Sequence, residues 1–122
     1  MDGSLVIGCK YFSYLSSAGR LLFQDGFGKS EGLEEKIAVA QNGSEVAVSL
    51  NEWKGSTFWD ARKSQTIAKS VSVYNLAQGK RIFNIELKPS PKSDLDYALS
   101  PEGSEVAILS DRRVTVCRLP KQ

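Results

Sequence analysis

The side chains best suited to chemistry in this sequence are two carboxylates, Asp94 and Asp96, which flank Leu95. Residues two apart in a strand point to the same side, so this pair has a geometry suited to acid–base work or to holding a cation. Acids at the start of a strand are more often simply solvated. The sequence contains no histidine, so the usual general base for a serine or cysteine nucleophile and the commonest zinc ligand are both missing. These observations predict a protein that is not an enzyme and that holds no metal ion and no cofactor.

Two further candidates are weaker. The segment from Gly26 to Ser30 places two glycines beside Lys29, but it lacks the glycine spacing and the helix of a phosphate-binding loop. We expect an ordinary turn there. Cys9 and Cys117 are the only cysteines, and their separation fits neither a metal site nor a disulfide framework. They would pair only if the fold brought the two ends of the chain together, and we expect reduced core thiols.

The sharpest local feature is a segment that holds both tryptophans, Trp53 and Trp59, close to Phe58 and Arg62. Tryptophan and arginine are enriched among the residues that dominate the energy of protein interfaces. We therefore predict a partner-binding site formed by Trp53, Phe58, Trp59 and Arg62, with Trp59 as the anchor and Arg62 as a polar contact. Two alternatives stay open: these residues cover an exposed edge or an oligomer contact, or the segment is a mobile loop.

Composition places the chain among soluble globular domains. Its 122 residues are 41% hydrophobic and 25% charged, and its longest apolar runs are only as long as a strand, which argues against a membrane span. The net charge of +2 is spread along the chain, without the dense basic stripe of a nucleic-acid binder. Val6–Cys9 resembles a lipoprotein cleavage box but lacks the basic and apolar regions of a signal before it, so a buried strand is the better interpretation. We expect a cytoplasmic protein that binds a protein partner, and neither nucleic acid nor a membrane.

The elements that carry these residues follow an internal repeat. The sequence Gly43-Ser-Glu-Val-Ala47 recurs 60 positions later as Gly103-Ser-Glu-Val-Ala107, with apolar segments on both sides of each copy. Repetition of this kind predicts a fold built from similar units. The same offset relates further pairs, namely Tyr14 with Tyr74, Gly19 with Gly79, Arg20 with Lys80, Leu22 with Ile82 and Phe23 with Phe83.

Each unit is predicted to consist of short antiparallel strands, because β-branched and aromatic residues alternate between Gly-, Asn- and Pro-containing turns. The complete unit is predicted to contain four strands: Ile37–Ala40, Glu45–Leu50, Ser70–Leu76 and Arg81–Leu87. It also has an insertion at 51–69, where the other copy needs only Ser110–Arg112. The fold class is therefore all-β. We expect one domain, 1–122, made of an incomplete unit at 4–27, a complete unit at 36–87 and an incomplete unit at 94–119.

The second copy resembles a blade of the WD-repeat or related propeller families, over Tyr97-Ala-Leu-Ser-Pro-Glu-Gly-Ser-Glu-Val-Ala-Ile-Leu-Ser-Asp111 and Val114-Thr-Val-Cys-Arg-Leu119. In those families an apolar strand ends in Ser-Pro-Asp-Gly and the next strand ends near an aspartate. The chain departs from the pattern at the Trp-Asp position, where it has Tyr74-Asn75 and Cys117-Arg118, and it lacks the opening histidine. The resemblance implies divergent β-propeller blades. It also implies that the insertion lies on the ring face most used for binding.

Counting strands limits the architecture. A propeller closes with about four to eight blades of four strands, whereas this chain supplies ten strands at most. Three interpretations follow: the C-terminal piece of a longer propeller, a subunit whose copies close a ring by self-association, or a small β-sandwich. The expected function is a non-catalytic protein-interaction module or scaffold. The alternative is the terminal part of a propeller enzyme or sugar-binding protein, to which Asp94, Asp96 or Arg112 would contribute.

Overall fold

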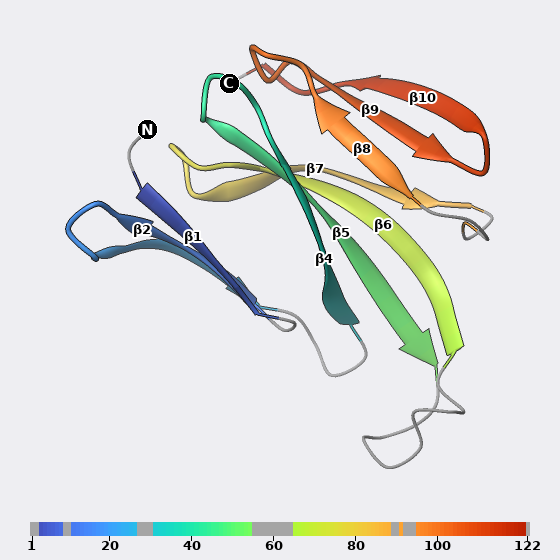
Figure 1. The fold of residues 1–122 in the computed structure, drawn as a ribbon, viewed down its shortest axis with the longest axis horizontal. Helices are drawn as coiled ribbons and strands as arrows, with labels where there is room; N and C mark the ends of the chain where they lie inside the picture. Colours follow the sequence, from blue (N-terminus) through green and yellow to red (C-terminus); the bar gives the residue numbers. More distant parts are fainter. Residues whose placement is uncertain are drawn as a thin grey trace.

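The computed structural model describes residues 3–8, 11–26, 31–54, 65–88, 91 and 95–121. These residues form ten β-strands and no helix, arranged in three antiparallel sheets that follow one another along the chain (Figure 1). The all-β prediction is therefore confirmed. None of the described residues belongs to a helix that could cross a membrane. The strands are β1 Gly3–Gly8, β2 Tyr11–Ser16, β3 Leu21–Gly26, β4 Glu31–Val39, β5 Glu45–Lys54, β6 Gln65–Asn75, β7 Lys80–Leu87, β8 Asp96–Leu99, β9 Glu105–Ser110 and β10 Arg113–Arg118.

The three sheets differ in their number of strands. The first sheet has the order β1-β2-β3, the middle sheet β4-β5-β6-β7 and the third sheet β10-β9-β8. In the middle sheet the strands are hydrogen-bonded in the order in which they occur in the chain, as the repeat predicts for a unit of four strands. In the third sheet β8 and β10 are the two edges, so the β10 edge has no neighbour among the described strands.

The repeated Gly-Ser-Glu segments form the same turn in both copies. Gly43 and Gly103 have φ values of 74° and 72°, a backbone conformation that glycine adopts at little cost. Each glycine donates its N–H to the carbonyl three residues earlier, Ala40 or Ser100, at 2.9 Å in both turns. The two turns also touch, because Asn42 donates its backbone N–H to the carbonyl oxygen of Pro101 at 3.0 Å. The repeat therefore fixes both the shape of each turn and one contact between the middle and third sheets.

The middle sheet is covered on both faces. Val46, Val48 and Tyr74 form one buried cluster with Tyr14 of the first sheet. The opposite face carries Ala47, Val71 and Val73, which form a second buried cluster with residues of the third sheet: Tyr97, Val106, Ile108 and Leu119. Successive side chains of a strand point to opposite faces, so consecutive apolar residues supply both clusters, namely Val46, Ala47 and Val48 in β5 and Val73 and Tyr74 in β6.

Two strands of the middle sheet continue beyond their predicted ends. We expected strands over Glu45–Leu50 and Ser70–Leu76, but β5 runs to Lys54 and β6 begins at Gln65. The additional residues form a paired hairpin, in which Trp53 lies opposite Thr66. The sequence predicts no strand there because most of these residues are polar, and a hairpin that extends past the core needs no alternation of apolar residues.

The start of the middle sheet also differs from the prediction. Strand β4 begins at Glu31, whereas the sequence predicted a first strand from Ile37. The register of β4 on β5 shifts between Leu33 and Ile37, at an irregularity in the pairing. Such an irregularity breaks the alternation of apolar and polar residues, so the sequence gives no signal for the first half of the strand.

The repeat needs one correction of register. Tyr14 lies opposite Phe23, and in the middle sheet the residue opposite Phe83 is Val73, not Tyr74. Tyr14 therefore corresponds in space to Val73, although a constant offset pairs it with Tyr74. The reason is the following turn: Gly19 bonds the carbonyl three residues back, at Ser16, while Gly79 bonds the carbonyl four residues back, at Asn75. One extra residue in the second turn shifts the alignment.

Candidate interaction surface

Of the predicted partner-binding residues, the structure describes only the backbone of Trp53. The backbone of Trp53 belongs to β5, next to a register irregularity between Glu52 and Trp53. Phe58, Trp59 and Arg62 lie outside the described residues, as does the side chain of Trp53. The site therefore stays a prediction, carried by a hairpin that is two paired strands as far as Lys54 and Gln65.

The predicted carboxylate pair lies only partly within the described structure. Asp94 is outside it, and the exposed Asp96 accepts a hydrogen bond at Oδ1 from the backbone N–H of Tyr97 at 2.7 Å. Arg112 is exposed in the turn between β9 and β10, with φ of 67°. In the described part of the chain, no three cysteine or acidic side chains lie close enough to hold a metal ion. A catalytic or sugar-binding role for Asp94, Asp96 or Arg112 stays untested.

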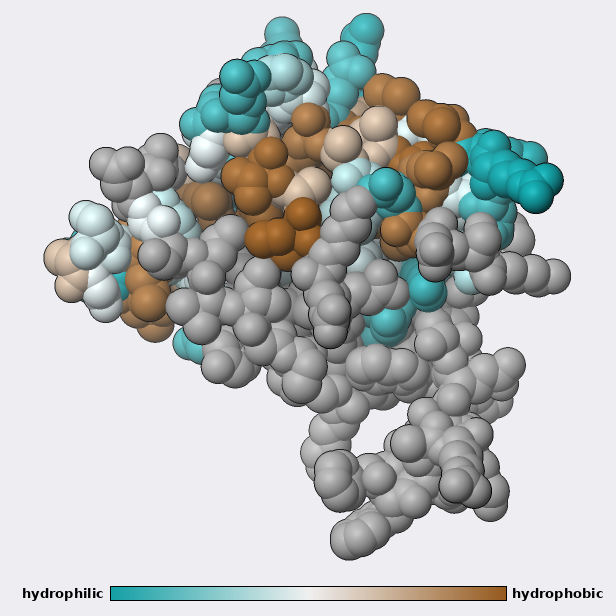
Figure 2. Space-filling model, viewed as in Figure 1, coloured by the Kyte–Doolittle hydropathy of each residue, from teal (hydrophilic) through white to brown (hydrophobic). Residues whose placement is uncertain are grey.

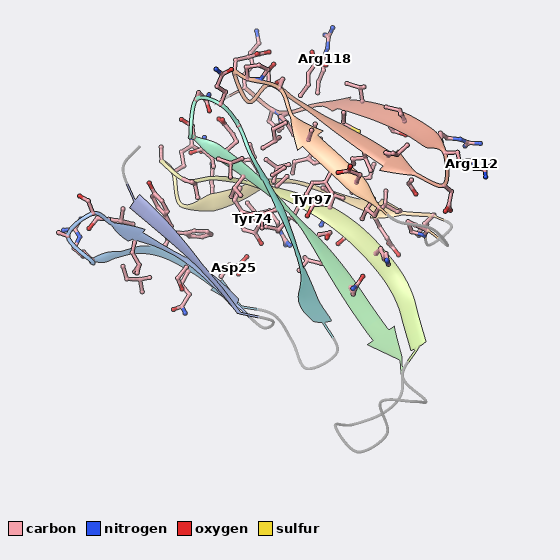
Figure 3. All side chains as sticks on the ribbon, in the orientation of Figure 1. Asp25, Tyr74, Tyr97, Arg112 and Arg118 are labelled. Carbon is pink, nitrogen blue, oxygen red and sulfur yellow. The ribbon has the colours of Figure 1, made fainter. Side chains whose placement is uncertain are left out.

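Two tyrosine hydroxyls form polar contacts between sheets. Tyr74 donates to Oδ2 of Asp25 at 2.7 Å across the first and middle sheets, and Tyr97 donates to the hydroxyl oxygen of Ser49 at 3.3 Å across the middle and third sheets (Figure 3). Burial raises the pKa of Tyr74, and the hydrogen bond to Asp25 raises it further. A phenol held neutral in this way donates a hydrogen bond and is poorly suited to act as a base. Sequence reasoning missed both contacts, because nothing in the sequence indicates which sheets will face each other.

The remaining cysteine within the described region is Cys117. It is half-buried on β10 with a free thiol, and it packs at the edge of the cluster between the middle and third sheets. The prediction of a reduced thiol at the core agrees with this position. Cys9 and the lipoprotein-like segment Val6–Cys9 cannot be compared in the same way, since Cys9 lies outside the described residues.

The third sheet has an apolar face that nothing in the described structure covers. This outer face carries Ala98, Ala107, Leu109, Val114 and Val116, of which the two valines are 64% and 58% exposed, and charged residues lie at its margins: Asp96, Glu105 and Arg118. Figure 2 shows hydrophobic side chains gathered on the surface over the region of the middle and third sheets. Large exposed apolar patches on proteins commonly mark interaction surfaces.

The repeat shows what happens to this face when a sheet follows it. Val114 pairs with Leu109 and Val116 with Ala107, just as Val71 pairs with Ser49 and Val73 with Ala47. Val114 and Val116 therefore correspond to Val71 and Val73. The latter two are 0% exposed because the third sheet packs on them. The outer face of the third sheet thus repeats a surface that is fully buried one unit earlier.

A groove lies between the end of β7 and the hairpin of β9 and β10. Its volume is about 340 Å³, and one wall is the end of β7, where Ile85 and Leu87 contribute apolar surface. The other wall comes from the hairpin of β9 and β10, through Ser110, Asp111, Arg113 and Thr115. Glu86 and Lys88 complete the lining and approach each other at 3.7 Å.

Comparison with solved structures identifies the fold. The crystal structure of the C-terminal WD40 domain of Sif2 superimposes on 98% of this chain with a TM-score of 0.67, at 12% sequence identity. The fold is that of WD-repeat-like propeller blades. The three sheets are consecutive blades, which confirms the all-β, partial-propeller prediction. At this identity the likeness concerns the fold alone.

The similarity covers only part of the neighbour. This chain spans 32% of the solved Sif2 chain. No family profile and no curated protein matches the sequence. These comparisons therefore show the fold, and they do not show which activity or partners this chain has.

Proposed function

We infer that this chain is a protein-interaction module of propeller type, without catalytic activity, that acts as a scaffold. The fold supports this proposal because WD40 propellers generally serve as non-catalytic platforms for protein partners. Propellers host many functions, so the position of the binding site has to come from the chain itself. We assign it to the hairpin of β5 and β6, with Trp53, Phe58, Trp59 and Arg62 as the contacting residues.

The observation that supports this assignment most is the length of the hairpin. Strands β5 and β6 contain 10 and 11 residues, compared with 6 each in the corresponding β9 and β10. Asn51 to Lys54 pair with Gln65 to Lys69, so the two ends of the aromatic segment are joined by paired strands. Such pairing limits the conformational entropy that a segment between two strands can lose when it binds a partner.

The test is capture of partner proteins by the full chain and by single variants, with the bound proteins identified and quantified. Trp59→Ala is expected to abolish capture of a specific partner, and Arg62→Ala to weaken it about tenfold or less. Gln78→Ala is the matched control, because Gln78 is exposed in the turn at the opposite end of β6. If the Trp59 variant captured as much partner as the control, the hairpin would not be the binding site.

Self-association is a separate part of the proposal. The outer face of the third sheet supports it, because its counterpart in the middle sheet is buried by a following blade. Light scattering behind size exclusion, over a tenfold concentration range, is expected to give an oligomer of discrete size. A folded monomer at every concentration would contradict self-association while leaving the interaction module intact. The cytoplasmic location expected from the sequence stays a prediction, as does the absence of nucleic-acid and membrane binding.

A further inference from the structure

Asn42 connects the turn between β4 and β5 to the turn between β8 and β9, which lie side by side (Figure 1). Its backbone N–H donates to the carbonyl oxygen of Pro101, and its side-chain Nδ2 donates to the carbonyl oxygen of Glu102, both at 3.0 Å. Its Oδ1 accepts from the backbone N–H of Ser44 at 2.9 Å, within its own turn. An N–H can only donate and a carbonyl oxygen can only accept, so these partners fix which end of the amide is which. The side-chain amide of Asn42 is therefore held at both ends.

Asn42 is followed by Gly43, and this is the single Asn-Gly pair in the sequence. The other asparagines, Asn51, Asn75 and Asn84, precede larger side chains. Asparagine is among the thermolabile residues of proteins, because its side-chain amide can be attacked by the backbone nitrogen of the next residue. Glycine obstructs this attack least, since it has no β-carbon. The sequence therefore places its least obstructed asparagine at a contact between two sheets.

The reaction consumes only water from the solvent. The Gly43 nitrogen forms a bond to Cγ of Asn42 and loses its proton, while the bond from Cγ to Nδ2 breaks and Nδ2 leaves as ammonia with that proton. The product is a cyclic imide. Water then adds to one of the two imide carbonyl carbons and breaks the bond of that carbon to the Gly43 nitrogen, which recovers a proton. Opening at Cγ gives aspartate, and opening at the backbone carbonyl gives isoaspartate, in which the chain continues through the former side chain.

The folded chain opposes the attack on Asn42. The Gly43 N–H donates to the carbonyl oxygen of Ala40 at 2.9 Å, so its proton is engaged. Attack makes Cγ tetrahedral, which moves Oδ1 and Nδ2 out of line with the N–H of Ser44 and the carbonyl oxygen of Glu102. Both bonds from Asn42 to the third sheet are released together when that sheet moves off the turn. Local opening of this kind limits reactions at protected groups in folded proteins.

We propose that Asn42 is a site of deamidation, that docking of the third sheet limits the rate of the reaction, and that conversion weakens this docking. The site lies at the opposite end of β5 from Trp53, and its modification needs no partner protein. Each opening of the contact allows Asn42 to react, and the product stays after the contact closes. The turn therefore records, irreversibly, how often the two blades have separated.

Both products disturb the contact. In the aspartate product an oxygen takes the place of Nδ2, so two acceptors face each other where Nδ2 donated to Glu102. The isoaspartate product adds a backbone carbon to a turn in which Gly43 has a φ of 74°. That turn leads directly into Glu45, whose buried side chain lies against Gly103. A longer backbone at residue 42 therefore shifts the residues on which the third sheet packs.

The first experiment compares the rate of deamidation in the folded chain and in a peptide. The full chain and a synthetic peptide with the sequence of Ala38 to Val48 are incubated in the same mildly alkaline buffer. Peptide mapping with mass spectrometry follows the conversion of Asn42 and separates aspartate from isoaspartate. We expect conversion in the folded chain to be slower than in the peptide by about a hundredfold or more, because the folded chain reacts only after opening. Urea at a concentration that unfolds the chain should remove this difference.

A second comparison loosens the contact with Gly103→Ala, since a β-carbon at Gly103 collides with Glu45. We expect deamidation of Asn42 to be about tenfold faster in this variant, because modification follows the population of the open form. Gly19→Ala is the matched control, since Gly19 also has a positive φ but has no atom within 4 Å of an added β-carbon. It should leave the rate unchanged. Both rates are measured at a temperature at which circular dichroism shows both variants folded.

The effect of conversion is measured with Asn42→Asp, which reproduces the aspartate product. Gln41→Glu is its matched control, because it adds the same charge at an exposed residue of the same turn. We expect Asn42→Asp to lower the unfolding midpoint by about 4 °C more than Gln41→Glu does. The isoaspartate form, purified by ion exchange from an incubated sample, should lose more.

Three results would overturn the proposal. Equal rates in the folded chain and the peptide would show that folding does not protect Asn42. Equal rates in Gly103→Ala and Gly19→Ala would show that the third sheet does not control the reaction. Equal midpoints of Asn42→Asp and Gln41→Glu, with an unchanged midpoint of the isoaspartate form, would show that conversion leaves the contact intact. Partner capture through Trp59 is tested separately, so none of these results bears on the proposed function.

Discussion

Tyr74 shows how a single hydroxyl contributes to the contact between two sheets. Its side chain is 0% exposed and its ring lies 5.6 Å from that of Phe23, so apolar packing fixes the ring while the hydroxyl reaches Asp25. A hydrogen bond to a charged acceptor is stronger than one between neutral groups. Asp25 itself is only half-buried, and water competes for its carboxylate.

Replacing Tyr74 by phenylalanine is expected to lower the free energy of unfolding by about 1–2 kcal/mol. The ring and its packing stay, but Asp25 loses the donor between the sheets. Urea denaturation measures the change, and a double-mutant cycle with Asp25→Ala isolates the pair. Additive effects of the two substitutions would show that the hydrogen bond contributes nothing to stability.

The same residue predicts a loss of stability at alkaline pH. The pKa of Tyr74 is raised in the folded state, mainly by burial, above the value of about 10 expected for an unfolded tyrosine. The neutral phenol is therefore favoured by folding: this contribution is fully present below about pH 10 and is lost as the pH rises further. Unfolding midpoints measured from pH 8 to 11 should fall more steeply for the wild type than for Tyr74→Phe. Parallel curves would contradict this assignment.

At the scale of elements, the turns decide how the sheets meet. The Gly103 turn lies against the side chain of Glu45, and a β-carbon at Gly103 would collide with the Glu45 carboxyl group. Glu45 is 6% exposed, so it has little room to move away. The close approach of this turn to the middle sheet therefore depends on a glycine, for reasons of space as well as of backbone conformation.

Gly103→Ala is expected to destabilise the chain by about 2–3 kcal/mol, from a positive φ and a steric clash together. Gly19→Ala is the matched control, since Gly19 has φ of 82° but no atom within 4 Å of an added β-carbon. It should cost about 1 kcal/mol, the backbone contribution alone. Thermal unfolding of both variants measures the difference. If both variants lost the same amount of stability, the contact with Glu45 would contribute nothing to it.

At the scale of the whole molecule, equivalent valines have opposite environments. Val71 and Val73 are buried between two sheets, whereas Val114 and Val116 face outward on the last sheet. Threonine is close to valine in size but adds a hydroxyl that is costly to bury without a hydrogen bond. The loss of stability on replacing each pair of valines by threonine therefore shows whether that face of its sheet is covered.

The double variant Val71→Thr/Val73→Thr is expected to lose about 2–5 kcal/mol of stability. Val114→Thr/Val116→Thr should change it by less than about 1 kcal/mol at low protein concentration. If the outer face self-associates, the unfolding midpoint of the wild type rises with concentration and that of the second variant does not. A midpoint independent of concentration for both would exclude self-association through this face.

Local sequence patterns predicted most of the strands and turns correctly. The Gly43 and Gly103 turns and the alternation of Val71 and Val73 with serines in β6 follow from backbone preference and side-chain alternation, which act over a few residues. The start of β4 and the paired stem of the hairpin were missed because a register irregularity and polar strands carry no periodic signal. For the candidate site, the residue types of Trp53 and its neighbours in the sequence suggested an interface, but the sequence does not indicate which residues surround them in space.

The sequence by itself determined that this protein is all-β, repetitive and composed of blade-like units, because repeats and turn residues can be recognised within short contiguous segments. Only the tertiary structure decided which faces are buried. Val71 and Val114 occupy matching positions in similar strands, yet one is enclosed and the other exposed, because the difference depends on whether a further sheet packs there. The same holds for strand pairing: β10 has a partner on one side only among the described strands, whereas the matching β6 is paired on both sides, because pairing depends on which segments meet in space.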